Sequence, residues 1–379
     1  MGLFIGLMSG TSLDGVDGVL AELPDPHDTD SDPPIQVLAH VHRAMPAALG
    51  AELLALNRSG PDELHRAALA AHGVVHLYAE AVAGLLVDSA TAAQAVAAVG
   101  AHGQTVRHRP REFDATGYTV QLLDGALLAE RCGIDVVCDF RSRDLAAGGE
   151  GAPLVPAFHA ARFGLPGRAS AVLNLGGIAN LTLLAADGAV SGFDCGPGNL
   201  LMDLWCRRER GQAFDAGGAW AAGGRVDEPL LAGWLADPFF GRPPPKSTGR
   251  DLFDEAWLLR APAVRSLPPQ DVMATLAELT ARAAAQALQR HAPATTRLLV
   301  CGGGAHNAHL MRRLAALLPG IAVASTATAG VPPDQVEALA FAWLAQRFVQ
   351  RLPGNLPAVT GARGPRVLGA LHPAGPRRA

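Results

Sequence analysis

The stretch from Gly6 to Gly18 constrains the fold more than any other part of the chain. It places a turn rich in Gly, Ser, Thr and Asp between the apolar runs 3–7 and 16–20. Two short apolar runs around such a turn predict a β-hairpin. The tip would present backbone N–H groups and small hydroxyls, which together can surround an anion.

Two further glycine loops lie at 174–180 and 301–307. Each follows an apolar, strand-like run, at 169–173 and 297–300. Three such loops in one chain predict a nucleotide held between two lobes.

The composition is that of a globular protein. With 379 residues, 49% hydrophobic and 17% charged, the chain can form two domains or one deeply cleft body. A net charge of −4 argues against a nucleic-acid partner. Polar residues interrupt the Ala-rich stretch 67–100 and no secretory pattern opens the chain, so we expect a cytoplasmic protein without a membrane partner. The five cysteines form no C-x-x-C pair, which favours reduced thiols.

Lysine occurs once, at Lys246, and Pro245 precedes it. A P-loop needs Gly-Lys-Ser/Thr, and a protein kinase needs a strand lysine in a different context. If the chain binds ATP, it therefore uses neither architecture. The Pro-rich surroundings of Lys246 predict a surface or interdomain contact.

The pattern of apolar residues predicts two similar α/β lobes, each opening on a glycine-tipped hairpin. We expect domain I at 1–139 plus 336–379, and domain II at 140–335. An exposed loop is expected at 24–34 and another at 239–250. The expected strands are 95–100, 118–123, 134–138, 190–194 and 297–300, with a second hairpin at 171–184; the expected helices are 61–89 (capped by Asp62), 124–132, 199–209, 270–291, 308–318 and 336–348.

Nine short motifs occur in order along the chain: GLMSGTSLDGVD (6–17), HGQT (102–105), DFR (139–141), AAGG (146–149), GAPLVP (151–156), NLGGIAN (174–180), FDCGPGN (193–199), PPPKSTG (243–249) and CGGG (301–304). Together they resemble the anhydro-N-acetylmuramic acid kinase family, and the resemblance continues to VTG at 359–361. Two positions depart from the family pattern: Cys195 stands where many members have Thr, and Glu150 where Gln is common.

The resemblance implies an α/β protein with two ribonuclease-H-like lobes around a deep nucleotide cleft, the actin/hexokinase/heat-shock-type kinase fold. It implies an enzyme of peptidoglycan recycling and amino-sugar catabolism. Members convert 1,6-anhydro-N-acetylmuramic acid, ATP and water into N-acetylmuramic acid 6-phosphate and ADP.

The substrate has no free hydroxyl at O6, because O6 is tied to C1 in the bicyclic acetal. Water must attack C1 while O6 takes the γ-phosphoryl group, so one carboxylate suffices as general base. Asp194 ends a strand and is the residue that the resemblance places at the sugar. The alternative is that Asp194 caps the helix opening near Asn199.

The resemblance also implies ATP and Mg²⁺ as cofactors. Asp14 and Asp17 are candidate Mg²⁺ contacts through water, with Asx-turns as the alternative role. The expected ATP contacts are Gly10, Thr11, Ser12, Leu13, Asp14, Gly15, Val16, Asp17, Gly176, Gly177, Gly302, Gly303 and Gly304.

Polar residues in or beside the motifs are candidates to bind the sugar, an anhydro-amino-sugar with a carboxylate, hydroxyls and an N-acetyl group. Arg143 could instead pair with Asp144, and Glu337 could act only on a helix dipole. The expected substrate contacts are Ser9, His102, Gln104, Arg143, Asp194 and Glu337.

Other readings of the chain stay open at this stage. A non-enzymatic ATP clamp of the actin or heat-shock type would share the fold, and so would an acetate-kinase-like acyl-phosphate kinase. A homodimer is also left open. His65, His72, His76 and Glu80 share a helix face, which we interpret as a polar face and not as a metal site.

Overall fold

The computed structural model describes residues 1–10, 12–26, 35–244, 246–249 and 252–375. By its internal contacts the chain divides into two compact units. Unit 1 is Met1–Phe158 with Gln335–Ala379, and unit 2 is His159–Asp334. The contacts thus assign 140–158 to the first unit, whereas the sequence pattern placed this segment in the second.

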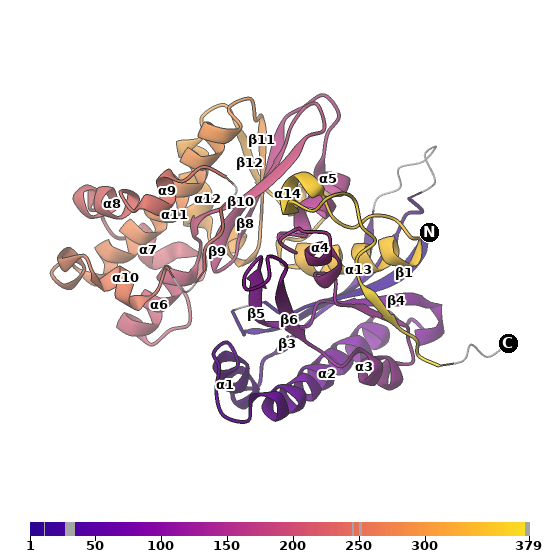
Figure 1. The fold of residues 1–379 in the computed structure, drawn as a ribbon. Helices are drawn as coiled ribbons and strands as arrows, with labels where there is room; N and C mark the ends of the chain where they lie inside the picture. The colour runs from indigo at the N-terminus through magenta and orange to yellow at the C-terminus, as the bar shows by residue number, and fades with distance from the viewer. Residues whose placement is uncertain (11, 27–34, 245, 250–251, 376–379) are drawn as a thin grey trace. The chain divides into compact units, whose positions relative to one another are not determined.

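Unit 1 is built on a sheet in the order β13-β7-β4-β1-β2-β3 (Figure 1). The first three strands form an antiparallel meander, and β4 and β7 run parallel to β1. The strands are β1 (Gly2–Met8), β2 (Gly15–Leu23), β3 (Gln36–Ala44), β4 (Val96–Ala101), β7 (Val136–Cys138) and β13 (Ala370–His372).

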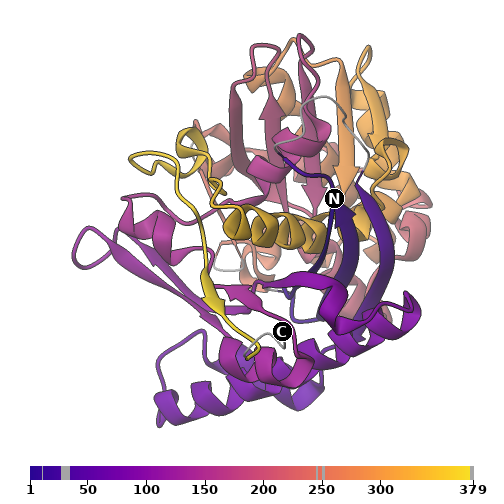
Figure 2. The ribbon, with the colours of Figure 1, turned by 90° about the vertical axis from the view of Figure 1, so that its right-hand side faces the viewer.

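Two long helices cover opposite faces of this sheet, as Figures 1 and 2 show. Ile5 and Leu7 point toward α2 (Glu63–Asp88) and join its buried face in one core. Gly6 points the other way, toward α13 (Val336–Val349). A Cβ at Gly6 would lie 1.8 Å from the carbonyl oxygen of Ala338, so only glycine allows α13 to lie this close.

Smaller elements complete unit 1, among them a separate hairpin inserted between β4 and β7. They are α1 (Ala47–Ala55), η1 (Ala93–Ala95), β5 (Gln104–Pro110), β6 (Gly117–Leu122), α3 (Gly125–Cys132), α4 (Ser142–Ala146), η6 (Pro333–Gln335) leading into α13, and α14 (Pro357–Thr360).

Unit 2 repeats the same plan. Its sheet has the order β10-β9-β8-β11-β12, again an antiparallel meander followed by two strands parallel to the first. The strands are β8 (Ser170–Leu175), β9 (Ile178–Leu184), β10 (Val190–Pro197), β11 (Arg297–Cys301) and β12 (Ala322–Ser325). Each unit thus places its first five sheet strands in the order third, second, first, fourth, fifth. This repeated order confirms two ribonuclease-H-like units.

Helices inserted between β10 and β11 pack against the unit 2 sheet and form its core with α12. The helical elements are α5 (Val155–Phe163, which crosses the unit boundary), α6 (Leu200–Arg210), η2 (Ala216–Gly218), α7 (Ala219–Ala222), α8 (Glu228–Leu235), α9 (Pro238–Gly241), α10 (Glu255–Leu259), η3 (Pro262–Arg265), α11 (Pro269–His291), η4 (Gly303–His306), α12 (Ala308–Leu317) and η5 (Thr326–Ala329).

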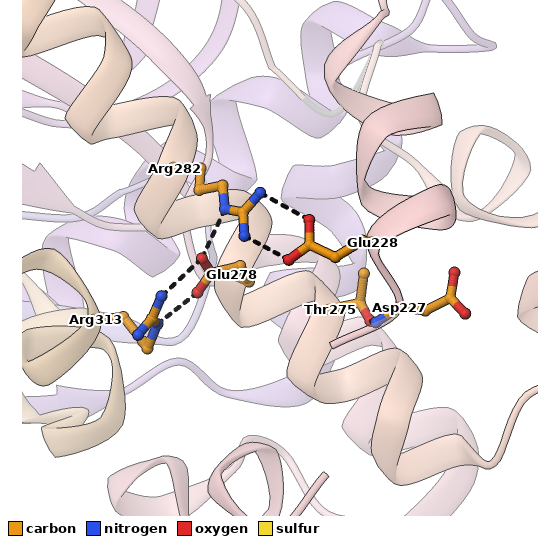
Figure 3. A network of polar contacts seen from close by, with 6 residues as sticks. All are labelled: Asp227, Glu228, Thr275, Glu278, Arg282 and Arg313. Atoms are coloured by element: carbon orange, nitrogen blue, oxygen red, sulfur yellow. Dashed lines mark hydrogen bonds and ion pairs between the residues drawn. The ribbon is translucent and has the colours of Figure 1, made fainter. Parts of the chain in front are cut away.

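A buried carboxylate ties three of these helices together (Figure 3). Glu278 on α11 is only 1% exposed, and it accepts hydrogen bonds from Arg282 (2.7 Å) and from Arg313 of α12 (2.6 Å). Arg282 also donates to both oxygens of Glu228 at the start of α8. Two guanidinium groups satisfy the buried carboxylate, so its charge supports the packing of α8, α11 and α12.

Three local predictions differ from the structure. Strand β3 was missed, because its alternation of half-buried and exposed residues is weak. Asp62 does not cap α2: it adopts a left-handed conformation and its side chain makes no cap hydrogen bond. The expected loop 239–250 begins inside α9. Of the expected loop 24–34, residues 27–34 lie outside the described residues.

Helix α2 is long and apolar enough to cross a membrane by length and composition alone. Val75, Tyr78, Ala81 and Leu85 on it are fully buried in the unit 1 core. His72 lies 3.8 Å from Asp124, and His76 is 2.7 Å from Arg131 on α3. The helix therefore has a core role, and its histidines contact neighbouring polar side chains.

Candidate active site

Buried polar side chains hold the turn between β1 and β2 in place by hydrogen bonds. The Ser9 hydroxyl lies 2.9 Å from the Tyr78 hydroxyl and donates to the carbonyl of Gly103. The Gln104 amide donates to the carbonyl of Gly10 over 3.0 Å. Ser9 and Gln104, expected to contact the sugar, thus also hold the shape of the proposed phosphate turn.

The outer part of this turn carries Ser12 and Asp14, both exposed. The Ser12 hydroxyl donates to Asp14 Oδ1 over 2.7 Å, and the Leu13 N–H donates to the Gly10 carbonyl over 3.3 Å. Leu13 has a φ of 58°, which is uncommon for a residue with a side chain. Thr11 lies outside the described residues.

The last residues of the turn belong to the strand β2. A Cβ at Gly15 would lie 2.4 Å from the carbonyl oxygen of Arg43 on β3, and Val16 is fully buried. Gly15 is therefore required by the sheet itself. Any nucleotide contact of Gly15 or Val16 would be through the backbone.

His102 and Arg141 form a pair on unit 1. The Arg141 guanidinium donates to His102 Nε2 over 2.8 Å and to the carbonyl of Gly151 over 2.7 Å. Burial and the adjacent guanidinium lower the pKa of His102 to about 3. The imidazole is therefore neutral at physiological pH, and since Nε2 accepts from Arg141, its proton is on Nδ1.

Glu337 of unit 1 interacts electrostatically with two other carboxylates, Asp17 and Asp14. Burial raises the pKa of Glu337, and the charges of Asp17 and Asp14 raise it further, although Arg141 opposes them. Burial would also raise the pKa of Asp17, but His40 and His42 hold it below the ordinary value. His42 Nδ1 lies within hydrogen-bond distance of Asp17 Oδ1, at 2.9 Å across neighbouring strands, and Asp17 lies within β2, so it does not form an Asx-turn.

Arg143 stands apart from these residues. Its side chain is exposed, and Asp144 accepts from Gly151, Asn355 and Thr360. The alternative pairing of Arg143 with Asp144 is therefore wrong. Arg141 was not predicted as a site residue, although it is the last residue of the motif DFR.

Asp194 of unit 2 lies at a bulge in β10, where the register against β9 shifts between Asp194 and Gly196. A bulge turns a side chain out of the regular pleat. Asp194 Oδ2 accepts from the Thr248 N–H over 2.9 Å. Burial raises the pKa of Asp194 to about 6, although that hydrogen bond and the charge of Lys246 oppose the rise. The side chain does not cap α6, so the capping alternative is wrong.

Lys246 was expected to make a surface or interdomain contact, and the surface position is wrong. Only 7% of the residue is exposed. Its ammonium donates to the carbonyl of Phe239 over 3.1 Å and lies 4.6 Å from the centre of the Phe239 ring. The Pro-rich sequence gave no signal of this burial, because the covering residues come from α9.

The turn between β8 and β9 carries Gly176 and Gly177. A Cβ would meet nothing closer than 3.6 Å at Gly176 or 4.0 Å at Gly177, and neither residue has a positive φ. The packing of the unit therefore does not require glycine at either position. Gly198 differs: a Cβ there would lie 2.3 Å from the carbonyl oxygen of Gly176.

The third glycine loop likewise contains glycines that the fold requires and one that it does not. Gly302 has a φ of 77°, and a Cβ on Gly304 would lie 2.5 Å from the Cβ of Leu175. Both are therefore needed by the fold. Gly303 is exposed, and the nearest atom to its Cβ would be 3.8 Å away. Gly303 is the position of this loop where a ligand could approach the backbone.

No metal cage is formed by the parts of the chain that the structure describes, since no group of three or more His, Cys, Asp or Glu residues is suitably arranged. Asp14 and Asp17 fit a weaker role. Mg²⁺ bound to nucleotide phosphates usually keeps several waters and needs only one or two carboxylates nearby.

Two units with the same five-strand order, each opening on a glycine-tipped hairpin, define a protein of the actin, hexokinase and heat-shock fold class. Within this class the particular family follows from the sequence match. The model of the family anhydro-N-acetylmuramic acid kinase matches residues 2–374, and the chain belongs to this family.

Relatives of that name are similar over nearly their whole length. The chain is 60% identical to the protein of Variovorax paradoxus (strain S110), with 98% of this chain and 99% of the relative covered. It is 60% identical to that of Bordetella petrii, covering 98% and 96%. It is 54% identical to that of Albidiferax ferrireducens, covering 98% and 99%. A solved structure, the activator of the 2-hydroxyisocaproyl-CoA dehydratase from Clostridium difficile with bound ADPNP, aligns at 12% identity and a TM-score of 0.48, covering 92% and 96%.

Proposed function

We propose that this chain is an ATP-dependent kinase that opens 1,6-anhydro-N-acetylmuramic acid with water and phosphorylates O6. The products are N-acetylmuramic acid 6-phosphate and ADP, in the recycling of cell-wall sugar in the cytoplasm. Family membership over residues 2–374 supports the overall reaction. Asp194 carries the mechanistic part of the proposal.

Asp194 has the properties of a general base. One oxygen is held by the Thr248 N–H, and no donor reaches Oδ1 among the described residues. Burial raises the pKa of the carboxyl to about 6, so it is ionised at pH 7 and is still basic enough to accept a proton. Oδ1 is thus available to a water molecule.

The chemical step needs one proton acceptor and one phosphoryl acceptor. Water attacks C1 and gives a proton to Asp194, while the bond between C1 and O6 breaks. O6 keeps that electron pair and takes the γ-phosphoryl group, and ADP leaves. No separate acid has to protonate O6, because phosphorus captures it.

The sugar contacts are proposed from unit 1. His102 is neutral and held by Arg141, so it would offer a fixed hydrogen-bonding group to a sugar hydroxyl or amide. Ser9, Gln104 and Glu337 complete the proposed contacts. Arg143 is exposed, and its positive charge could attract the lactyl carboxylate.

The phosphate contacts are proposed at the glycines that the fold does not itself require: Gly10, Gly176, Gly177 and Gly303. Exposed backbone N–H groups without side chains can approach an anion closely. Mg²⁺ carried by the phosphates would neutralise their charge, and Asp14 and Asp17 would contact it through water.

The first test is the dependence of ADP release on the sugar. ADP should form with 1,6-anhydro-N-acetylmuramic acid and not with acetate, which separates this reaction from an acetate-kinase-like one. Asp194→Asn should lower kcat by about 10²–10⁴-fold, because a positioned general base contributes that much. Asp187→Asn is the matched control, since Asp187 is an exposed carboxylate of unit 2 in the β9–β10 turn. Turnover of Asp194→Asn within a few-fold of the parent would remove Asp194 from this role.

A further inference from the structure

Lys246 is the only lysine of the chain, and it is buried beside the proposed base. Its ammonium donates to the carbonyls of Phe239 and Phe240, at 3.1 and 3.5 Å, in the short helix α9. It also lies over the Phe239 ring. These contacts attach the segment 246–249 to α9.

The same segment is attached to Asp194 by two hydrogen bonds. The Asp194 N–H donates to the Lys246 carbonyl over 3.1 Å, and the Thr248 N–H donates to Asp194 Oδ2 over 2.9 Å. The Asp194 carboxylate is therefore oriented by a segment whose own position depends on the Lys246 side chain. Phe240 adds packing, since its ring lies 2.7 Å from where a Cβ of Gly196 would be.

The surroundings of Lys246 make a positive charge at this position energetically unfavourable. Burial lowers the pKa of Lys246, and Arg290 and Arg242 repel it further. His291 and Cys195 are the other titratable groups near it. Asp194 is the carboxylate that attracts it. A buried cation that two arginines repel needs a compensating role, because apolar side chains pack at lower cost.

We propose that Lys246 is a positioning residue of the hydrolytic step: its side chain attaches the segment 246–249 to α9, and this segment orients the Asp194 carboxylate. This inference rests on the proposed role of Asp194. In this proposal the single lysine orients the general base Asp194 and does not contact the phosphates of ATP.

The test compares pH profiles of kcat/KM for the parent, Lys246→Met and Lys246→Arg. Loss of the Lys246 contacts with α9 should weaken the hydrogen bond from the Thr248 N–H to Asp194, so the acidic limb, near pH 6 in the parent, should move upward by about 0.5–1 unit. Lys246→Arg keeps a cationic hydrogen-bond donor and should restore the limb. Arg265→Met, an exposed unit 2 residue, is the control for a change of net charge and should leave the limb in place. An unshifted limb in Lys246→Met would overturn the proposal.

A second measurement does not need any Lys246 variant to fold. Lysine labelled with ¹³C at Cε gives a single signal in this chain, because lysine occurs once. We expect that signal to shift with a midpoint near pH 6 in the parent and to lose this transition in Asp194→Asn. A transition that persists in Asp194→Asn would come from a group other than Asp194 and would contradict the proposal.

The two failures can be told apart. If Asp194→Asn retains its turnover, the proposed function of Asp194 is wrong. If Asp194→Asn is inactive while the lysine signal does not report its titration, only the role of Lys246 is wrong.

Discussion

At the residue scale, Asp194 is held in a state that costs stability. Burial raises its pKa from 3.8 to about 6, so the folded chain binds its proton more tightly than the unfolded chain does. The protonated carboxyl therefore stabilises the fold below pH 3.8, and this stabilisation is lost as the pH rises through 6. Functional groups often carry such a cost, because their environment is set by the reaction.

Asp194→Asn should accordingly be more stable than the parent at pH 7 and no more stable at pH 4. A shift of this size corresponds to about 1–3 kcal/mol in unfolding free energy. Denaturant titration followed by tryptophan fluorescence measures it, since Trp205, Trp220, Trp234 and Trp257 all lie in unit 2. An equal difference at both pH values would show that ionisation of Asp194 does not destabilise the fold.

The limits of sequence reasoning are also clearest at individual residues. Asp194 could be singled out because it ends a strand inside a motif. For Lys246 the sequence predicts a surface or interdomain contact, because a Pro-rich loop gives no signal that α9 and Phe239 will cover it. Arg143 was expected at the site, yet Arg141, two residues earlier, is the one whose guanidinium contacts His102. Burial by residues distant in sequence is what the sequence pattern could not supply.

At the scale of elements, prediction succeeded where periodicity was strong. The hairpins β1–β2 and β8–β9 and the helices α11 and α13 lie where apolar runs and helical spacing placed them. Strand β3 was missed because half of it faces solvent. The glycine loops could be located but not resolved into glycines required by packing and glycines free to meet a ligand. That distinction needs coordinates.

The glycines that packing does not require give a testable prediction at the scale of elements. Gly177→Ala should fold normally and weaken ATP binding by about tenfold or more, because the new Cβ would keep the phosphate away from the backbone N–H, and a hydrogen bond to a charged group contributes about 1.5–3 kcal/mol. The KM for ATP and the unfolding midpoint measure the two effects separately.

Two matched variants define what that result means. Gly233→Ala lies inside α8 with nothing within 4 Å of the new Cβ, so ATP binding should not change, and the unfolding midpoint should not fall, because alanine favours a helix more than glycine does. Gly198→Ala should instead lower the unfolding midpoint, because the new Cβ meets the Gly176 carbonyl. Unaltered ATP binding in Gly177→Ala would remove this turn from the proposed phosphate site.

At the scale of the whole molecule, the chain contains the same sheet order twice with different insertions. Unit 1 inserts the β5–β6 hairpin between its fourth and fifth strands, and unit 2 inserts helices between its third and fourth. The proposed reaction uses His102 and the first glycine turn from one unit and Asp194 from the other.

The proposed coupling of ring opening at C1 to phosphorylation of O6 can be tested by following the oxygen of water through the reaction. In water enriched in ¹⁸O, the account predicts one labelled oxygen at C1 of the N-acetylmuramic acid 6-phosphate and none in its phosphate group, because water attacks carbon and O6 attacks phosphorus. Mass spectrometry of the product, with fragmentation between sugar and phosphate and a short reaction time that precedes exchange at C1, locates the label. Label in the phosphate, or in free phosphate at the rate of ADP release, would mean that water attacks ATP, and it would contradict the proposed reaction.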